Sequence, residues 1–257
     1  MENTAAKLED ALARTEADTD AALKSATALA SQLKRAKKAA SVGSLRDLER
    51  ALEGAEELAG TLRDSVRTAR TGWRFDDRAY LDSGEFAQEL LAAAQAAGVR
   101  VVEQEDRLVS YPSLVRILPA DAAIEIDRRR LRSIRPSVVV ESLKRAQTRP
   151  LRFRPATFLE TLFRAYRLVL AENGRDLGSV ARVVDLYRVL TLLPTAAYTK
   201  PEFARDLHQL DESGETRTRD GLTLSFSAAT GTKGGSFLPA VTSSGDVKPY
   251  YGIAFRP

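Results

Sequence analysis

Residues 8–71 carry the clearest pattern in the chain, and they read LEDALARTEADTDAALKSATALASQLKRAKKAASVGSLRDLERALEGAEELAGTLRDSVRTART. Apolar or small side chains recur there at alternating steps of four and three residues. They are Leu8, Leu12, Thr15, Thr19, Ala22, Ala26, Leu29, Leu33, Ala36 and Ala40, then Leu45, Leu48, Leu52, Ala55, Ala59, Leu62, Val66 and Ala69. Such spacing is typical of helices that pack along a heptad seam. Gly43 interrupts it, so residues 1–71 are predicted to form a long antiparallel helical hairpin that resembles a coiled coil.

The predicted first helix would be on the order of 50 Å long at 1.5 Å per residue. This exceeds what a small domain needs for its own core, so the hairpin is interpreted as an arm that docks onto another subunit. An ordinary helical pair packed on the domain is the simpler alternative. The candidate partner-binding residues are Leu8, Leu12, Leu29, Leu33, Leu45, Leu48, Leu52 and Leu62.

Residues 72–257 are predicted to form an α+β body that is mainly helical, with short β-hairpins. The expected helices cover residues 82–97, 136–147, 155–173, 180–193 and 199–210, and the expected strands cover 99–102, 108–111, 114–118 and 123–127. Residues 211–257 are expected to form a C-terminal β-hairpin. A helix followed by such strands is also compatible with a winged-helix arrangement.

The composition excludes several classes of site. The 257 residues contain no cysteine and one histidine, which excludes a disulfide framework, a thiolate zinc centre and a multi-histidine metal site. No segment approaches the roughly 18 consecutive apolar residues of a membrane span, and the acidic residues 1–20 do not resemble a signal peptide. We therefore expect a cytoplasmic protein with no cofactor and no membrane partner.

Positive charge is concentrated in residues 128–154. The segment holds ten basic residues and one acidic residue, Glu141, although the whole chain has a net charge of only +4. The basic residues are Arg128, Arg129, Arg130, Arg132, Arg135, Lys144, Arg145, Arg149, Arg152 and Arg154. Like charges repel unless an anion compensates them, and arginine binds phosphate oxygens in a bidentate manner. The segment therefore predicts contacts with the phosphate backbone of DNA or RNA.

Two other interpretations of this basic segment remain open. Residues 71–127 hold 11 acidic and 5 basic residues and could neutralise it within the same molecule. An acidic surface on another subunit could do the same.

Glu125 and Asp127 are the candidate metal ligands. They lie two residues apart on a predicted strand, so both carboxylates would point to one face and could hold Mg²⁺, as in nucleases. The lysine that usually accompanies such a pair is absent, which makes solvated strand-face acids the simpler interpretation. His208 is expected in the last turn of a helix, where its cationic form would suit the helix dipole.

These observations predict a non-catalytic nucleic-acid-binding subunit of a multi-protein complex. Its N-terminal helices would dock onto a partner such as an ATPase or a nuclease, and a homo-oligomer is also compatible with the pattern. The first alternative is a protein-only scaffold or adaptor whose basic face binds an acidic subunit. The second is a metal-dependent nuclease.

Overall fold

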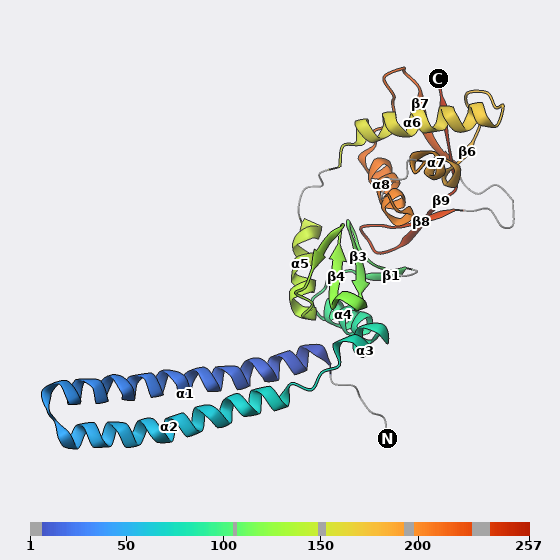
Figure 1. Ribbon diagram of the computed structural model, residues 1–257. Helices are drawn as coiled ribbons and strands as arrows, with labels where there is room; N and C mark the ends of the chain where they lie inside the picture. Colours follow the sequence, from blue (N-terminus) through green and yellow to red (C-terminus); the bar gives the residue numbers. More distant parts are fainter. Residues whose placement is uncertain (1–6, 105–106, 149–152, 193–197, 228–236) are drawn as a thin grey trace. The chain divides into compact units, whose positions relative to one another are not determined.

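The computed structural model describes residues 7–104, 107–148, 153–192, 198–227 and 237–257. It is an α+β structure in which long N-terminal helices precede shorter helices and small antiparallel sheets (Figure 1). The helices are α1 (Leu8–Val42), α2 (Leu45–Gly72), α3 (Asp77–Asp82), α4 (Glu85–Ala96), the 3-10 helix η1 (Pro119–Asp121), α5 (Pro136–Thr148), α6 (Pro155–Glu172), α7 (Val183–Leu190) and α8 (Lys200–Ser213). The strands are β1 (Val102–Gln104), β2 (Arg107–Ser110), β3 (Ser113–Leu118), β4 (Ala123–Ile126), β5 (Arg129–Leu131), β6 (Ala181–Arg182), β7 (Thr223–Ser227), β8 (Leu238–Val241), β9 (Val247–Tyr250) and β10 (Gly252–Arg256).

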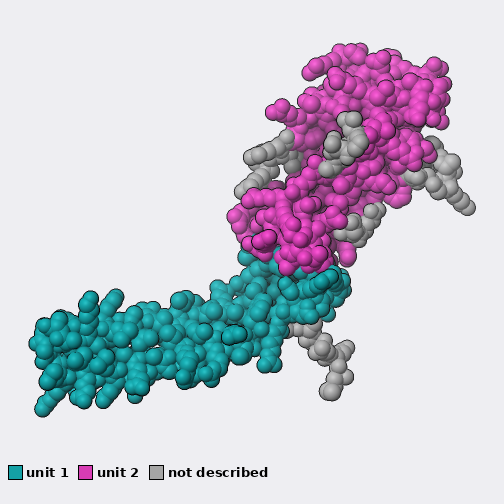
Figure 2. Space-filling model, in the orientation of Figure 1, with its two compact units in different colours: residues 1–90, 134–138 teal, residues 91–133, 139–257 magenta. Residues whose placement is uncertain are grey.

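The chain divides into two compact units (Figure 2). The first contains residues 1–90 and 134–138, and the second contains residues 91–133 and 139–257. The first unit therefore includes α3 and the start of α4 in addition to the predicted hairpin of residues 1–71.

Helices α1 and α2 form an antiparallel pair within the first unit (Figure 1). Gly43 ends α1 in the left-handed conformation, with φ of 75°, which glycine adopts without a steric penalty. The backbone N–H of Ser44 then donates to the Ala39 carbonyl at 2.9 Å, so the chain reverses within two residues. This tight connection places α2 directly along α1.

The seam between α1 and α2 differs from the predicted one in every second position. Buried and half-buried residues recur at alternating steps of three and four. They are Leu8, Ala11, Thr15, Asp18, Ala22, Ser25, Leu29, Gln32, Ala36 and Ala39 in α1, and Leu48, Ala51, Ala55, Leu58, Leu62, Ser65 and Ala69 in α2. Columns that differ by one residue are hard to distinguish from apolar content alone. Small side chains in the seam let the two helix axes approach closely.

The other predicted seam positions lie one residue further along, outside the seam. We call them the outer column: Leu12, Thr19, Ala26, Leu33 and Ala40 in α1, and Leu45, Leu52, Ala59 and Val66 in α2.

The N-terminus of α1 is held by Glu89 of α4. Its carboxylate accepts the backbone N–H groups of Leu8 and Glu9, each at 2.9 Å, and the hydroxyl of Tyr80. A negative charge at this end of a helix is favourable because the first N–H groups have no partner within the helix. Tyr80 comes from α3, a short helix that the sequence pattern did not predict.

The second unit contains a five-stranded antiparallel sheet in the order β1-β2-β3-β4-β5. Four of these strands were expected, with β1 beginning at Val102 rather than at residue 99. Strand β5 was not expected, because its arginines lack the apolar alternation of a half-buried strand. As an edge strand it tolerates exposed charges, which also discourage pairing with other chains.

The main core of the second unit lies between α6, α7, α8 and the sheet β6-β10-β7. Tyr166, Phe203 and Phe255 are its largest fully buried side chains. Helix α7 is shorter than the predicted 180–193, because Ala181 and Arg182 pair with β10 and are extended. A Cβ on Gly252 would lie 2.7 Å from a Val180 methyl carbon, so this pairing requires a glycine in β10.

The C-terminal region contains two strand pairings instead of one simple hairpin. Strand β7 pairs with β10, and between them in sequence β8 and β9 form a separate two-stranded sheet.

Candidate functional site

Four of the ten candidate nucleic-acid-binding residues are compensated within the fold. The nitrogen–oxygen distances are 2.5 Å for Arg128–Glu202, 2.6 Å for Arg130–Asp121, 2.7 Å for Arg135–Glu9, 2.6 Å for Arg135–Glu16 and 3.4 Å for Arg145–Glu141. Only one of these acidic partners, Asp121, belongs to the acidic segment 71–127 that the sequence singled out.

Arg135 is a structural residue of the first unit. Its guanidinium binds Glu9 and Glu16 on successive turns of α1, and the Glu9 carboxylate also accepts the backbone N–H and hydroxyl of Ser137. Burial alone would raise the pKa of Glu9, but these hydrogen bonds outweigh it and hold the pKa below its usual value. Arg135 therefore fastens the start of α5 to α1.

Four other candidates are exposed and have no ion pair or side-chain hydrogen bond among the residues that the structure describes: Arg129, Arg132, Lys144 and Arg154. The remaining two, Arg149 and Arg152, lie outside the described residues.

Asp127 and Arg128 form the two-residue turn between β4 and β5. Their φ angles are 47° and 67°, and Ile126 pairs with Arg129 across the turn. Turns with two positive φ angles favour Asn, Asp and Gly, so an arginine there is strained by about 1–2 kcal/mol. Both side chains of this turn bind α8.

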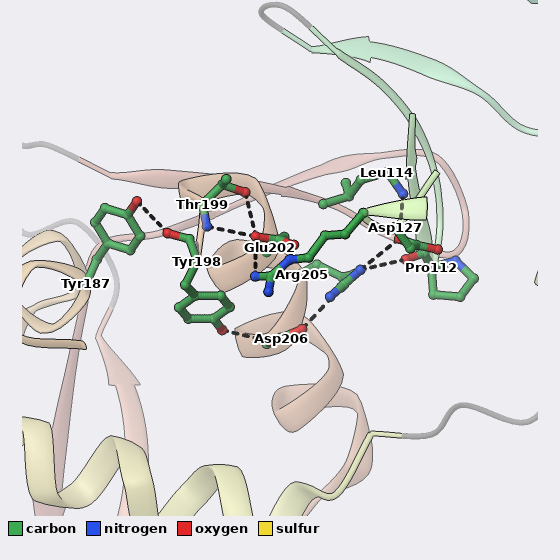
Figure 3. Close-up of polar contacts among 10 residues, drawn as sticks. Pro112, Leu114, Asp127, Tyr187, Tyr198, Thr199, Glu202, Arg205 and Asp206 are labelled. Atoms are coloured by element: carbon green, nitrogen blue, oxygen red, sulfur yellow. Dashed lines mark hydrogen bonds and ion pairs between the residues drawn. The ribbon is translucent and has the colours of Figure 1, made fainter. Parts of the chain in front are cut away.

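The Arg128 guanidinium makes a bidentate contact with Glu202, through Nε at 2.5 Å and an Nη at 2.9 Å. The same carboxylate accepts the backbone N–H and hydroxyl of Thr199, which begins α8 (Figure 3). Burial alone would raise the pKa of Glu202, but the hydrogen bonds from Arg128 and Thr199 outweigh it and lower the pKa. Glu202 is therefore an ionised, nearly buried anchor for Arg128.

Asp127 makes the second contact with α8. One of its carboxylate oxygens accepts the Leu114 backbone N–H and the Arg205 guanidinium, each at 3.1 Å (Figure 3). Arg205 continues to Asp206, whose other oxygen accepts the Tyr198 hydroxyl at 2.7 Å. Burial, followed by the Asp206 charge, raises the pKa of Tyr198, so its hydroxyl stays protonated and donates.

The predicted pairing of Glu125 with Asp127 on one strand face is wrong, because β4 ends at Ile126 and Asp127 has entered the turn. Glu125 stays in the sheet, opposite Arg116 of β3 and Arg130 of β5. Across the described part of the chain, no three His, Asp or Glu side chains are grouped as metal ligands.

A pocket of about 390 Å³ adjoins this turn. Its charged lining is balanced between three guanidinium groups and three carboxylates, and the rest is mostly hydroxyl-bearing. The lining residues are Arg107, Leu114, Arg116, Glu125, Asp127, Arg128, Tyr198, Thr199 and Glu202. The two acids that leave the sheet for the turn and α8 are already bound to arginines. This arrangement stabilises the contact between the turn and α8, and it contains no paired nucleophile and base.

The sequence analysis missed Glu202 and Arg205. A local signal for Glu202 exists, because a glutamate three residues after Thr199 fits a capping box. Nothing local predicts its contact with Arg128, which is 74 residues away in the chain.

The candidate partner-binding leucines fall into two groups. Leu8, Leu29, Leu48 and Leu62 lie in the seam, where the hairpin itself covers them. Leu12, Leu33, Leu45 and Leu52 lie in the outer column, and the last three are 49–74% exposed. Only the outer group can reach a partner without opening the hairpin.

His208 is buried instead of lying at an exposed helix end as a cation. Its Nδ1 lies 3.1 Å from the Tyr250 hydroxyl, and only 4% of the residue is exposed. Burial lowers the pKa of His208, although the carboxylates of Glu212 and Asp211 act in the opposite direction. The expectation that its charge serves the helix dipole is corrected accordingly.

In the described parts of the chain, every helix is too short or too polar to cross a membrane. Comparison of the whole chain with protein-family models, with curated proteins and with solved structures found no match.

Proposed function

We propose that the protein is a non-catalytic nucleic-acid-binding subunit whose phosphate contacts come from the exposed part of its basic segment. The observation that supports this is the state of Arg129, Arg132, Lys144 and Arg154. All four are exposed and lack a carboxylate partner among the described residues. Exposed guanidinium and ammonium groups close together in sequence favour a polyanion, since each phosphate contact releases a counterion.

The geometry narrows the interface that the sequence suggested. Arg128 and Arg135 hold buried or half-buried carboxylates of their own molecule. A phosphate could recruit either arginine only by leaving that carboxylate without its partner, which is costly. Binding therefore rests on the other basic side chains and is expected to be independent of nucleotide sequence.

A salt titration tests this proposal. Fluorescence anisotropy would follow binding of the full chain to labelled duplex DNA, single-stranded DNA and RNA at increasing salt concentration. Replacing Arg129 and Arg132 by glutamine removes two phosphate contacts. The slope of log K against log salt concentration for duplex DNA should then fall by about 1.8.

The matched control is Arg182→Gln/Arg188→Gln, which removes the same charge from two exposed arginines outside the segment. Both bind Asp185 in the free protein. The control should leave the salt slope unchanged. An absence of binding to all three nucleic acids at low salt would rule out the proposal, as would equal effects of the two double variants.

A protein-only scaffold is the second candidate, and the exposed leucines of the outer column favour it. In that case the chain ignores nucleic acid, and a protein partner is lost when the outer column is made polar. The nuclease alternative is not proposed, because Asp127 is bound to Arg205 and the Leu114 amide. The winged-helix and coiled-coil interpretations, an ATPase or nuclease partner and a cytoplasmic location remain predictions.

A further inference from the structure

The outer column is an apolar surface that the hairpin leaves uncovered. Leu33 is 49% exposed, Leu45 is 74% exposed, Leu52 is 50% exposed and Val66 is 51% exposed. These are the largest apolar side chains of the column after Leu12, yet the seam beside them is formed largely by alanine and polar residues. The hairpin therefore buries its smaller side chains and exposes its larger ones.

The two halves of the outer column lie on the same side of the hairpin. In α1 and in α2 alike, each outer residue follows a seam residue by one position, as Leu12 follows Ala11 and Leu52 follows Ala51. Antiparallel helices are related by a local two-fold axis perpendicular to their common plane, so equal offsets from the seam fall on the same face. Leu23, 64% exposed, adjoins this face because it is four residues after Thr19 and three before Ala26.

Charge is distributed unevenly along the hairpin. Residues 32–52, which surround the connection at Gly43, hold six basic and two acidic side chains. The flanking described residues, 7–31 and 53–72, hold nine acidic and six basic side chains. The tip of the hairpin is therefore positive and the rest is negative.

We propose that the outer column is a dimer interface between two copies of this chain, with the hairpins packed face to face and pointing in opposite directions. A two-fold symmetric interface must be complementary to itself. An apolar face that is positive at one end and negative at the other meets that requirement when one copy is reversed. This inference does not depend on nucleic-acid binding.

The charge pattern selects both the occupant and its orientation. A reversed second copy places each positive tip against the acidic part of the other hairpin. The same face packed with the tips together would bring twelve basic and four acidic residues into one region, which repel. The apolar face then completes a four-helix arrangement, in which each hairpin covers the leucines that the other exposes.

Sedimentation velocity of the full chain, treated with nuclease, tests the interface over a wide range of protein concentrations. The wild type should show the mass of two chains at the higher concentrations. The variant Leu45→Gln/Leu52→Gln/Val66→Gln should raise the dimer dissociation constant on the order of a hundredfold or more, because six apolar side chains per dimer lose their burial. Glutamine keeps the helix propensity high, so far-ultraviolet circular dichroism should not change.

The matched control is Ala21→Gln/Ala28→Gln/Thr68→Gln, which alters three exposed positions on the opposite side of the seam. It should dimerise like the wild type. A monomeric wild type at every concentration overturns the proposal and leaves the face to another protein. A dimer that the control weakens as much as the outer-column variant overturns it too. If the triple variant loses helicity, Leu33→Gln/Leu52→Gln replaces it.

The absence of native cysteine permits a direct test of orientation. A spin label at Ser41→Cys, beside the tip, should report a distance between the two copies of roughly the length of α1, about 50 Å at 1.5 Å per residue. A label at Ala30→Cys, near the middle of α1, should report a much shorter distance. A short distance between the Ser41 labels would show that the tips lie together and would overturn the reversed arrangement.

Discussion

The hairpin α1–α2 and the core around α6 and α8 use apolar residues in opposite ways. In the second unit, Tyr166, Phe203 and Phe255 are completely buried. In the hairpin, the fully buried residues other than Leu8 are alanines, while Leu33, Leu45 and Leu52 are about half exposed or more. The second unit satisfies its own hydrophobic surface, whereas the hairpin keeps a large part of its surface available. This difference is why we place the protein–protein contact on the hairpin.

The largest expected effect comes from removing a core aromatic side chain. Phe203 is fully buried, and its ring packs against Phe158, Tyr187 and Tyr198. Phe203→Ala should lower the free energy of unfolding by about 3–5 kcal/mol, measured by urea denaturation. Leu52→Ala, at 50% exposure, should cost the monomer less than about 1 kcal/mol. Equal losses in the two variants at low protein concentration would contradict the comparison.

The next effect concerns Arg128, which the sequence assigned to nucleic acid and the structure assigns to Glu202. Arg128→Ala should cost about 2 kcal/mol at neutral pH, since it leaves a nearly buried carboxylate with fewer donors. The cost stays below that of a fully buried pair because Arg128 is 54% exposed. Arg128→Gly should be less damaging by about 1 kcal/mol, because glycine relieves the strain of φ 67°.

The pH dependence of this contribution has a definite sign. The pKa of Glu202 is lowered in the folded protein, so its stabilising contribution is complete above the ordinary glutamate value of 4.5 and is lost as the pH falls through the folded value. The difference in unfolding free energy between wild type and Arg128→Ala should therefore shrink below pH 4.5. A difference that stays constant down to complete acid unfolding would contradict the role of the Arg128–Glu202 pair.

The sequence predicted local structure better than it predicted the roles of charged residues. The helices beginning at Pro136, Pro155 and Thr199 were found because proline and capping residues act within a few positions of the helix start. The seam of the hairpin was predicted one column away from its true position in every second residue. Leu12 and Ala11 are both acceptable seam residues, and only the packing of the two helices distinguishes them.

The compensation of the basic segment could not be predicted, because it depends on long-range contacts. Arg128 meets Glu202 only after the β4–β5 turn packs on α8, and Arg135 meets Glu9 across 126 residues of chain. Counting charges by segment identified Arg130 and Asp121 as a possible pair, but it gave no information about the other two contacts. A cluster of arginines in sequence is therefore a weaker predictor of an interface than the exposed remainder after folding.

The smallest effects are expected at two glycines of the hairpin, with opposite signs. Gly43 has φ of 75°, which an alanine adopts at a cost of about 1–2 kcal/mol, so Gly43→Ala should destabilise the hairpin although its Cβ meets no atom. Gly60 lies within α2 in ordinary helical geometry, also with open space at its Cβ, and Gly60→Ala should stabilise by about 0.5–1 kcal/mol. Urea denaturation followed by the fluorescence of Trp73, the only tryptophan, measures both variants. Because neither glycine belongs to the outer column, both variants should retain the dimer. A dimer weakened by Gly60→Ala would mean that the interface reaches a different face of α2 from the one that carries Leu52 and Val66.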